Sequence, residues 1–342
     1  FRLLQEKGEN LKKLDILYAT NRNYLNITLA SILSVIDNSR IENLRIHMMT
    51  EGFLDSDYDK AQMLLGEFPN VTLSFYPIEE FDLKQYKIPG WQDTQAANAR
   101  LFFQKILGKN LNNIEELLYL DSDAMVVGDL NGLNQYNGKI HAVLDNAHPS
   151  YIKKLGVSRY FNSGVLKINT NWWKKENCEE RIIKFVKDNP TKKLTYPDQD
   201  VLNCALESDI EELPMSYNLS PAITLMQGLT LNLFCDRFNK DLEMIKDSKA
   251  NPKILHSYGL LGIKPWTNNK VNPYNEIFRK YIYEVNPDFQ LQELSSAKKI
   301  LSSNPTLFNS LFLVKSYTPE CLQDILKETA LTFYKKKENS KK

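Results

Sequence analysis

The sequence predicts an α/β protein built on a mostly parallel central sheet with helices on both faces. In the first 120 residues, short apolar runs alternate with segments in which apolar residues recur at helical spacing. Such alternation is typical of strand–helix–strand units, whose helices cover both faces of a parallel sheet. We therefore expect a Rossmann-like, nucleotide-binding type of architecture, with ligands collecting at the carboxyl ends of the strands.

The pattern places the elements of this sheet in order along the chain. Strands are expected at residues 14–19, 44–49, 71–76 and 116–120, with helices at residues 24–36, 57–68 and 96–107. Polar loops are expected at residues 20–23 and 87–93. Farther on, strands are predicted at residues 140–144 and 164–169, and helices at residues 178–188 and 200–205.

The last part of the chain differs in character. Beyond residue 285 the pattern changes to helical segments with polar breaks, which end in the basic stretch YKKKENSKK at residues 334–342. We therefore expect an α/β domain at residues 1–284 and a mainly helical C-terminal extension with a basic tail at residues 285–342.

Composition excludes some classes of function. The 342-residue chain is 42% hydrophobic and carries 43 basic and 42 acidic residues, so its net charge is +1. Because there is no global field to attract nucleic acid, an anionic ligand must be met by a local site. The four cysteines form no CxxC pair, which favours a reducing compartment and argues against structural zinc. With no leader-like or membrane-spanning apolar run, a cytoplasmic location is expected.

Two aspartates follow the strand predicted at residues 116–120. In a strand, residues two apart point to the same side, so Asp121 and Asp123 would share a face. Two like charges raise each other's pKa unless a cation lies between them. Carboxylate oxygens suit Mg²⁺, Mn²⁺ or Ca²⁺, and such an ion could hold a diphosphate. On spacing alone, the alternative that both aspartates cap a loop stays open.

Other stretches fall into line with this D-x-D motif. They are LYATNRNY (17–24), NARLFF (98–103), YFNSGVLKIN (160–169) with YPDQDVLN (196–203), and LHSYGLLGIKPW (255–266). In this order they resemble family 8 of the retaining glycosyltransferases, which includes glycogenin and bacterial lipopolysaccharide galactosyltransferases. The resemblance runs from about residue 14 to residue 266. It implies a GT-A fold that binds a nucleotide sugar, usually a UDP-hexose, through manganese.

The resemblance implies a role for each matching residue. Asp121, Asp123 and His256 match the family's metal ligands, a set that suits Mn²⁺, with Mg²⁺ as the other candidate. Asn21 departs from the family, whose members often carry an acidic residue there, but its amide oxygen can still accept the uracil N3 proton. The positions expected to bind the nucleotide end of the donor are Ala19, Thr20, Asn21, Asn23, Tyr24 and Ser122.

Further matches concern the sugar. Arg100 matches the arginine that holds the donor sugar and the phosphate near it. The planar guanidinium suits this role because it can bind two oxygens at once. Asp198 and Gln199 match the pair that grips the sugar hydroxyls. The loop under the sugar is matched by Asn162, Ser163 and Gly164.

The reaction that the resemblance implies retains the configuration of the sugar. The neutral amide of Gln199 is a poor nucleophile, so we favour a front-face route in which the leaving UDP oxygen helps deprotonate the acceptor hydroxyl. Lys264 matches the lysine that neutralises the diphosphate as UDP leaves. Seven residues separate His256 from Lys264, two more than the usual family spacing. This loop must therefore bulge, with Gly259 or Gly262 near the phosphate.

The motifs and the resemblance together predict a Mn²⁺-dependent retaining hexosyltransferase that uses UDP-glucose or UDP-galactose. The expected acceptor is a hydroxyl of a bacterial surface glycan, a lipid-linked glycan or a glycoprotein. The basic tail would give weak peripheral contact with the inner face of a membrane, about 1 kcal/mol for each lysine. One alternative is a catalytically silent carbohydrate- or partner-binding module. Another is a sugar-nucleotide nucleotidyltransferase, which needs a glycine-rich basic loop where ATNRNY stands.

Several other side chains are expected to be structural. His47 and His141 lie in apolar strand patterns and are expected in the core or at a sheet edge. Trp172 and Trp173 follow a strand and are expected to pack at the start of a helix. Asp200 is expected to start a helix rather than to hold the donor.

Overall fold

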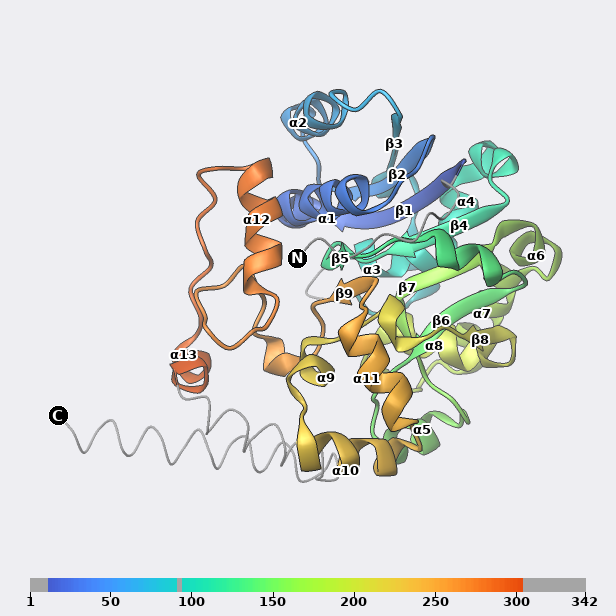
Figure 1. The fold of residues 1–342 in the computed structure, drawn as a ribbon. Coiled ribbons are helices and arrows are strands. Elements are labelled where there is room, and N and C mark those ends of the chain that lie inside the picture. Colours follow the sequence, from blue (N-terminus) through green and yellow to red (C-terminus); the bar gives the residue numbers. More distant parts are fainter. Residues whose placement is uncertain (1–11, 91–93, 304–342) are drawn as a thin grey trace.

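The fold is described by a computed structural model that covers residues 12–90 and 94–303. Within these residues a seven-stranded sheet with the order β3-β2-β1-β4-β7-β6-β8 forms the centre, and helices cover both of its faces (Figure 1). Four of its six strand pairings are parallel. The predicted α/β class with a mostly parallel sheet is confirmed.

The parallel half of the sheet follows the predicted elements closely. Thr20 and Asn21, predicted in a loop, extend the first strand because they pair with Thr50 and Glu51 of the second. The strands are β1 (Leu14–Asn21), β2 (Leu44–Glu51), β3 (Val71–Pro77) and β4 (Glu116–Leu120), and the helices between the first three are α1 (Leu25–Asn38) and α2 (Asp55–Leu65).

The other half of the sheet is mixed. β7 (Phe161–Asn169) runs antiparallel to both β4 and β6 (Ile140–Leu144), and the short β8 (Ile210–Glu212) lies parallel to β6. β7 begins three residues before the predicted strand, because Phe161 pairs with Leu144 although the run FNSG looks like a loop in sequence. The first residues of β7 therefore lie inside the sheet.

The helix predicted at residues 96–107 is broken. α3 (Ala96–Ala99) and α4 (Phe103–Leu107) are separated by a 3-10 turn at Arg100–Phe102, and all three residues of this turn are buried. A 3-10 stretch inside a helix often marks a functional position. Here the turn carries Arg100, one of the predicted site residues.

Each face of the sheet has its own hydrophobic core. Ile16 and Tyr18 of β1 belong to the core shared with α1 and α12 (Asn275–Val285), whereas Leu17 and Ala19 belong to the core on the opposite face. The latter core includes α4, α7 (Cys178–Asp188) and α8 (Pro197–Leu206). Burial along nearly all of β1 is what a sheet covered on both faces requires.

Residues 124–303 contain further elements that apolar periodicity does not predict. β5 (Ala124–Val126) pairs with β9 (Ile254–His256) in a separate two-stranded sheet. In the described ranges, no helix has both the length and the apolar character needed to cross a bilayer. The additional helices are α5 (Pro149–Leu155), α9 (Pro221–Leu225), α10 (Gly228–Phe238) and α11 (Leu242–Ala250). A further helix, α13 (Ser296–Ser303), lies in the part beyond residue 285 where helical segments are predicted.

The chain beyond α12 contacts the α/β domain as far as Lys298, whose Nζ donates a hydrogen bond to the Gly262 carbonyl. Gln292 donates a backbone hydrogen bond to the Trp266 carbonyl at 3.0 Å and accepts one from the Asn268 N–H at 2.8 Å. The rest of the predicted extension, residues 304–342 with the basic tail, lies outside the described residues.

Candidate functional site

The candidate site lies at the carboxyl ends of β1 and β4, beside the start of β7. Strand geometry in β4 ends at Leu120, and the backbone then turns, since the Asp121 carbonyl accepts a hydrogen bond from Ala124 N at 2.9 Å. Strand alternation is therefore not what brings Asp121 and Asp123 together. Their position comes from the turn and from the β5–β9 pair, which sets Ala124 opposite His256.

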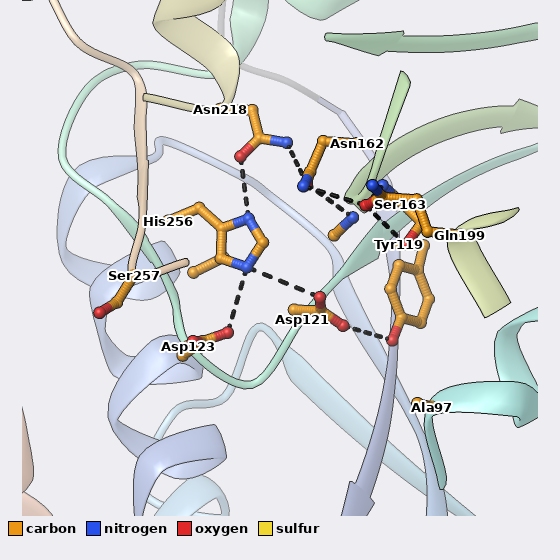
Figure 2. A network of polar contacts seen from close by, with 12 residues as sticks. Ala97, Tyr119, Asp121, Asp123, Asn162, Ser163, Gln199, Asn218, His256 and Ser257 are labelled. Atoms are coloured by element: carbon orange, nitrogen blue, oxygen red, sulfur yellow. Dashed lines mark hydrogen bonds and ion pairs between the residues drawn. The ribbon is translucent and has the colours of Figure 1, made fainter. Parts of the chain in front are cut away.

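Three potential metal ligands meet at this turn. His256 Nε2 lies 3.2 Å from Asp123 Oδ1 and 3.6 Å from Asp121 Oδ2 (Figure 2). One ligand atom from each residue can be chosen so that all three lie within 4.8 Å of one another. Two oxygens and one imidazole nitrogen at this spacing fit a divalent ion such as Mn²⁺ or Mg²⁺. The structure thus brings the three predicted ligands together.

Gly164 of β7 lies directly behind these ligands. A Cβ built at this position would lie 2.1 Å from His256 Cε1 and 2.6 Å from Asp121 Oδ2. The Gly164 carbonyl also accepts a hydrogen bond from Asp121 N at 2.8 Å. Only glycine lets the β7 backbone approach the ligands this closely. The structure therefore places Gly164, a residue expected under the sugar, against the potential metal ligands.

Asp123 and Lys264 form a largely buried ion pair. Lys264 Nζ lies 2.5 Å from Asp123 Oδ2 and donates a hydrogen bond to the Ser257 carbonyl at 2.5 Å. Burial alone would raise the pKa of Asp123, but the charge of Lys264 and the contact with His256 hold it well below its ordinary value. Burial likewise opposes the charge of Lys264, yet Asp123 raises its pKa overall.

Arg100 joins the two halves of the site. Its Nη2 lies 2.7 Å from Asp121 Oδ1, its Nε lies 3.2 Å from Asp198 Oδ2, and its Nη1 donates to the Ser163 carbonyl at 2.8 Å. Burial opposes the charge of Arg100, but Asp121 and its other neighbours raise its pKa overall. Burial raises the pKa of Asp198, and Arg100 opposes that shift. One guanidinium thus contacts both a potential metal ligand and α8.

Gln199 lies in the centre of a hydrogen-bonded cluster on the sugar side. Its Oε1 accepts hydrogen bonds from Ser163 N and Asn162 Nδ2, both at 3.1 Å. Its Nε2 donates to Asp145 Oδ2 at 3.0 Å. Residues from β7, from α8 and from the end of β6 are therefore held together by this one amide.

Asp145 is a site residue that the sequence motifs do not reveal. Its carboxylate accepts hydrogen bonds from both Asn162 and Gln199. Burial raises the pKa of Asp145, and these two hydrogen bonds oppose the shift. Asp145 directly follows β6, as Asp121 directly follows β4. A carboxylate immediately after a predicted strand is the signal that could have identified it.

The residues expected at the nucleotide end follow β1. Ala19 lies in the buried part of the strand, and Asn21 Oδ1 accepts a hydrogen bond from Tyr24 N at 3.3 Å, which caps the 3-10 turn Arg22–Tyr24. Asn23 is exposed. The Tyr24 ring packs edge-to-face on Trp266, with 5.9 Å between ring centroids. The two ends of the motif series, near residues 24 and 266, therefore lie side by side.

Thr20 and Ser122 are buried and face α1. Thr28 of α1 lies between them, with its hydroxyl 2.8 Å from the Thr20 hydroxyl and donating to Ser122 Oγ at 2.9 Å. These hydroxyls fasten the turn that carries Asp121 and Asp123 to the helix. Their contacts are with the protein framework, whereas the resemblance implies that they face the donor.

The loop between His256 and Lys264, which the spacing predicts to bulge, follows an unusual backbone path. Its residues Gly259, Leu260, Leu261 and Gly262 all have positive φ, at 72°, 39°, 56° and 71°. Such a left-handed run is unusual for leucine. The loop therefore needs support from its surroundings.

Four of the residues expected to be structural are buried within the fold. His47 Nε2 lies 2.9 Å from Asp15 Oδ1. Asp200, in the first turn of α8, is fully buried and accepts hydrogen bonds from the Tyr151 and Tyr160 hydroxyls at 2.6 and 2.5 Å. His141 is buried in β6, and Trp173 is buried in α6 (Thr170–Lys175). The expected burial of the two histidines and of Trp173, and the place of Asp200 at the start of a helix, are confirmed.

Two known proteins are similar to this chain in sequence. General stress protein A of Bacillus subtilis is 27% identical over 259 residues, which cover 74% of this chain and 86% of that protein. A lipopolysaccharide 1,2-glucosyltransferase of Escherichia coli K12 is 31% identical over 217 residues, which cover 60% of this chain and 62% of that protein. This chain thus spans less than two thirds of the length of the second relative.

A solved structure and the family model complete the comparison. The galactosyltransferase LgtC, in complex with donor and acceptor sugar analogues, superimposes with a TM-score of 0.63 at 21% identity, covering 80% of this chain and 96% of that one. The GT-A fold that the resemblance implies is therefore confirmed. The family model described as "Glycosyl transferase family 8" matches residues 15–270, and the chain therefore belongs to that family.

Proposed function

We propose that the protein is a retaining, metal-dependent hexosyltransferase that moves glucose or galactose from a UDP-sugar to an acceptor hydroxyl. The observation that carries this proposal is the convergence of Asp121, Asp123 and His256 beside two basic side chains, Arg100 and Lys264. The acidic ligands would hold a cation, and the cation and the two basic side chains would hold a diphosphate. Family membership supplies the reaction type.

Mn²⁺ is the proposed ion, with Mg²⁺ as the alternative. Asp121 and Asp123 would provide anionic oxygens and His256 a neutral nitrogen, a mixed set that suits Mn²⁺. Gly164 leaves room for this arrangement because any side chain there would meet His256 and Asp121. When bound, the ion would supply positive charge that stabilises the leaving diphosphate.

The remaining polar residues are proposed to bind the sugar and the leaving group. Arg100, held in place by Asp121 and Asp198, would bind the sugar and the phosphate nearest to it. Lys264 would offset the charge that develops on UDP. Asp198 and Gln199 would orient the sugar hydroxyls, with Asn162 and Ser163 holding the Gln199 amide.

Retention is proposed to follow the front-face route. The amide nearest the sugar side, Gln199, is neutral and already donates to Asp145 and accepts from Ser163. Such a group can position a substrate but is a poor nucleophile. The uridine is proposed to lie at the end of β1, near Ala19, Asn21, Asn23 and Tyr24.

The acceptor is proposed to be a bacterial surface glycan, a lipid-linked glycan or a glycoprotein. Support comes from the E. coli relative, whose name states that it acts on lipopolysaccharide. We assign the reaction to residues 1–284 and regard residues 285–342 as an extension. Peripheral contact with a membrane through the basic tail remains part of this proposal.

The test is hydrolysis of a panel of nucleotide sugars, with Mn²⁺ or with chelator, by the wild type and by Asp123→Ala. We expect Mn²⁺-dependent release of UDP from one sugar and its loss in Asp123→Ala. Asp129→Ala is the matched control, because Asp129 is exposed and its carboxylate only caps a loop through Asn131. NMR of the released or transferred sugar reports whether the anomeric configuration is retained.

If the wild type neither turns over a donor nor binds UDP in the presence of Mn²⁺, the proposal is wrong. The fold would then serve as a carbohydrate- or partner-binding module. If instead a nucleotide sugar is made from a sugar phosphate and a nucleoside triphosphate, the chain is a nucleotidyltransferase.

A further inference from the structure

The second ring nitrogen of His256 has a buried partner that no sequence motif marks. His256 Nδ1 lies 2.9 Å from Asn218 Oδ1 (Figure 2). Asn218 is 1% exposed and lies in the segment between the 3-10 turn Met215–Tyr217 and α9. It therefore contacts a potential metal ligand from the side away from Asp121 and Asp123.

The hydrogen bonds of the neighbouring Asn162 determine the orientation of the Asn218 amide. Gly164 N–H donates to Asn162 Oδ1 at 3.0 Å, and a backbone N–H can only donate, so that atom of Asn162 must be the oxygen. The other end of the Asn162 amide faces acceptors, Asp145 Oδ2 and Gln199 Oε1, both at 3.1 Å. The same Asn162 oxygen lies 2.8 Å from Asn218, which must therefore present its Nδ2 there.

The orientation of Asn218 decides the tautomer of His256. With Nδ2 directed at Asn162, the Asn218 oxygen faces the imidazole, and a carbonyl oxygen can only accept. His256 must then carry a proton on Nδ1. Nε2, the atom that faces Asp121 and Asp123, is the ring nitrogen left available to a metal ion. A histidine that binds a metal ion through Nε2 requires the proton on Nδ1.

We infer that Asn218 is a positioning residue that holds His256 in its metal-binding tautomer. This inference rests on the metal site proposed above. Through Asn162 the same chain of hydrogen bonds reaches Gln199, so the metal side and the sugar side of the site share one network. Gly164, at the origin of the chain, contributes through its backbone N–H as well as through its missing side chain.

The tautomer can be read directly in the metal-free protein by long-range ¹H–¹⁵N NMR of the histidine rings. The chain has only 4 histidines, and His256→Gln assigns the signal. We expect Nδ1 to carry a proton in the wild type and to carry it only partly in Asn218→Leu. Asn218→Asp keeps an acceptor at Nδ1 and is expected to keep the proton there. A wild-type ring without a proton on Nδ1 would overturn the inference.

Mn²⁺ affinity, measured by titration calorimetry without donor, gives the second readout. We expect Asn218→Leu to weaken Mn²⁺ binding by about 10- to 100-fold and Asn218→Asp to stay within about threefold of the wild type. If the wild type binds Mn²⁺ and Asn218→Leu binds it with the same affinity, the role of Asn218 is overturned but the proposed metal site is not. Failure of the wild type to bind Mn²⁺ would overturn the proposed metal site, and this role with it.

A separate observation concerns the strained loop before Lys264. Residues that prefer other backbone angles persist in a left-handed run only where the surroundings hold them. The support comes from the chain beyond α12: Leu294 packs in one cluster with Leu260 and Ile263, and Lys298 Nζ of α13 donates to the Gly262 carbonyl at 2.9 Å. These contacts fall on Leu260 and Gly262 within the left-handed run and on Ile263, which follows it.

The other side of Lys264 is held by the same segment. Gln292 hydrogen bonds to the backbone of Trp266 and Asn268, just after Lys264. We propose that residues 292–298 are a brace that positions Lys264, with Lys298 as its polar contact. Because Lys264 is proposed to meet the diphosphate, this assignment also rests on the proposed function. It gives the start of the C-terminal extension a role in donor binding.

The chain offers a matched pair of lysines to test the brace. Lys298→Met removes the contact with Gly262, whereas Lys299→Met removes the same charge from the next residue of α13, whose Nζ pairs at the surface with Glu293. In the ligand-free protein we expect backbone amides of residues 259–263 to exchange hydrogen faster in Lys298→Met by about fivefold, the effect of one lost hydrogen bond. Lys299→Met should match the wild type.

Binding of uridine and of UDP, in the presence of Mn²⁺, completes the test. We expect Lys298→Met to weaken UDP binding by about fivefold and to leave uridine binding unchanged, because only the diphosphate depends on Lys264. Equal behaviour of the two lysine variants in both measurements would overturn the brace. A wild type that binds UDP no better than uridine would instead overturn the diphosphate site, while the exchange experiment would still report on the loop.

Discussion

Two buried clusters of aspartate, histidine and basic residues lie at opposite ends of the parallel strands, and they differ in how their charges are balanced. At the amino end, His47 Nε2 and Arg45 Nε lie 2.9 and 2.6 Å from Asp15 Oδ1. His47 Nδ1 lies 3.2 Å from the Tyr76 hydroxyl. One carboxylate is thus shared by one guanidinium and one imidazole, and both ring nitrogens have partners within the protein.

At the carboxyl end, acids outnumber bases. Among the described residues, the acidic side chains of this cluster exceed the basic ones by two, which is the charge of one divalent ion. Burial raises the pKa values of Asp145 and Asp198, as expected where cations are too few. Charge balance, rather than residue type, therefore distinguishes the structural cluster from the candidate ligand site. The four acidic side chains of this cluster are Asp121, Asp123, Asp145 and Asp198, and the two basic ones are Arg100 and Lys264.

The largest effect is expected from removing one carboxylate of the acidic cluster. Asp123→Asn should weaken Mn²⁺ binding and Mn²⁺-dependent UDP release by about 1,000-fold or more, because losing a ligand costs more than the 10- to 100-fold typical of an outer partner. Calorimetry and donor hydrolysis measure the two effects. Full Mn²⁺ affinity in this variant would mean that the excess of carboxylates does not serve a cation.

The same substitution at the amino end should act on stability instead. Asp15→Asn removes the charge shared by Arg45 and His47, so the free energy of unfolding should fall by about 2 kcal/mol. Mn²⁺ affinity should stay within about twofold of the wild type, because Asp15 contacts none of the proposed ligands. Urea unfolding measures the change in the free energy of unfolding, and calorimetry measures the Mn²⁺ affinity. A loss of Mn²⁺ affinity like that of Asp123→Asn would break the contrast between the clusters.

The elements at the two ends of the sheet also differ in how well the sequence predicts them. β1 to β4 were predictable because each is a short segment rich in apolar residues, and Asp121 and Asp123 because they follow such a segment. β5 and β9 were not, since each has three residues and is defined by pairing across about 130 positions of the chain. The convergence of the metal ligands depends on that pair, which no local pattern encodes.

Several site residues were missed for the same reason. The side-chain contacts of Asn218 and Lys298 that carry their proposed roles join them to residues far away in sequence, His256 and Gly262. Nothing in their own neighbourhood distinguishes them from other asparagines and lysines. Arg100 was predicted from its motif, but its 3-10 turn was not, because the surrounding residues carry helical periodicity.

A smaller effect is expected from crowding the acidic cluster without changing its charge. Gly164→Ala adds a methyl group that would lie 2.1 Å from His256 Cε1, so the ligands must move and Mn²⁺ affinity should fall by about tenfold. Gly156→Ala is the control, because no described atom lies within 4 Å of its added Cβ although its φ is +78°. It should lower stability by about 1 kcal/mol and leave Mn²⁺ affinity unchanged. Equal affinities in the two variants would contradict the assigned role of Gly164.

The smallest effect is the pH dependence of the amino-end cluster. The charged or titratable groups facing Asp15 are Lys13, Arg45, His47 and Tyr76. Burial alone would raise the pKa of Asp15, but hydrogen bonds from His47 and Arg45 and the charge of Arg45 lower it overall. A carboxyl group with a lowered folded pKa contributes stability above its unfolded pKa, about 3.9, and loses it as the pH falls through the folded value.

The difference in unfolding free energy between the wild type and Asp15→Asn should therefore reach its full size by pH 5. Below pH 4 it should narrow, by at most about 1.4 kcal/mol for each pH unit between the two pKa values. Urea unfolding of both proteins at pH 6, 5, 4 and 3 measures this difference. A difference that widened toward pH 3 would mean that burial dominates at Asp15, as it does at Asp145 and Asp198. The amino-end cluster would then be short of cations too, and charge balance would no longer separate the two ends of the sheet.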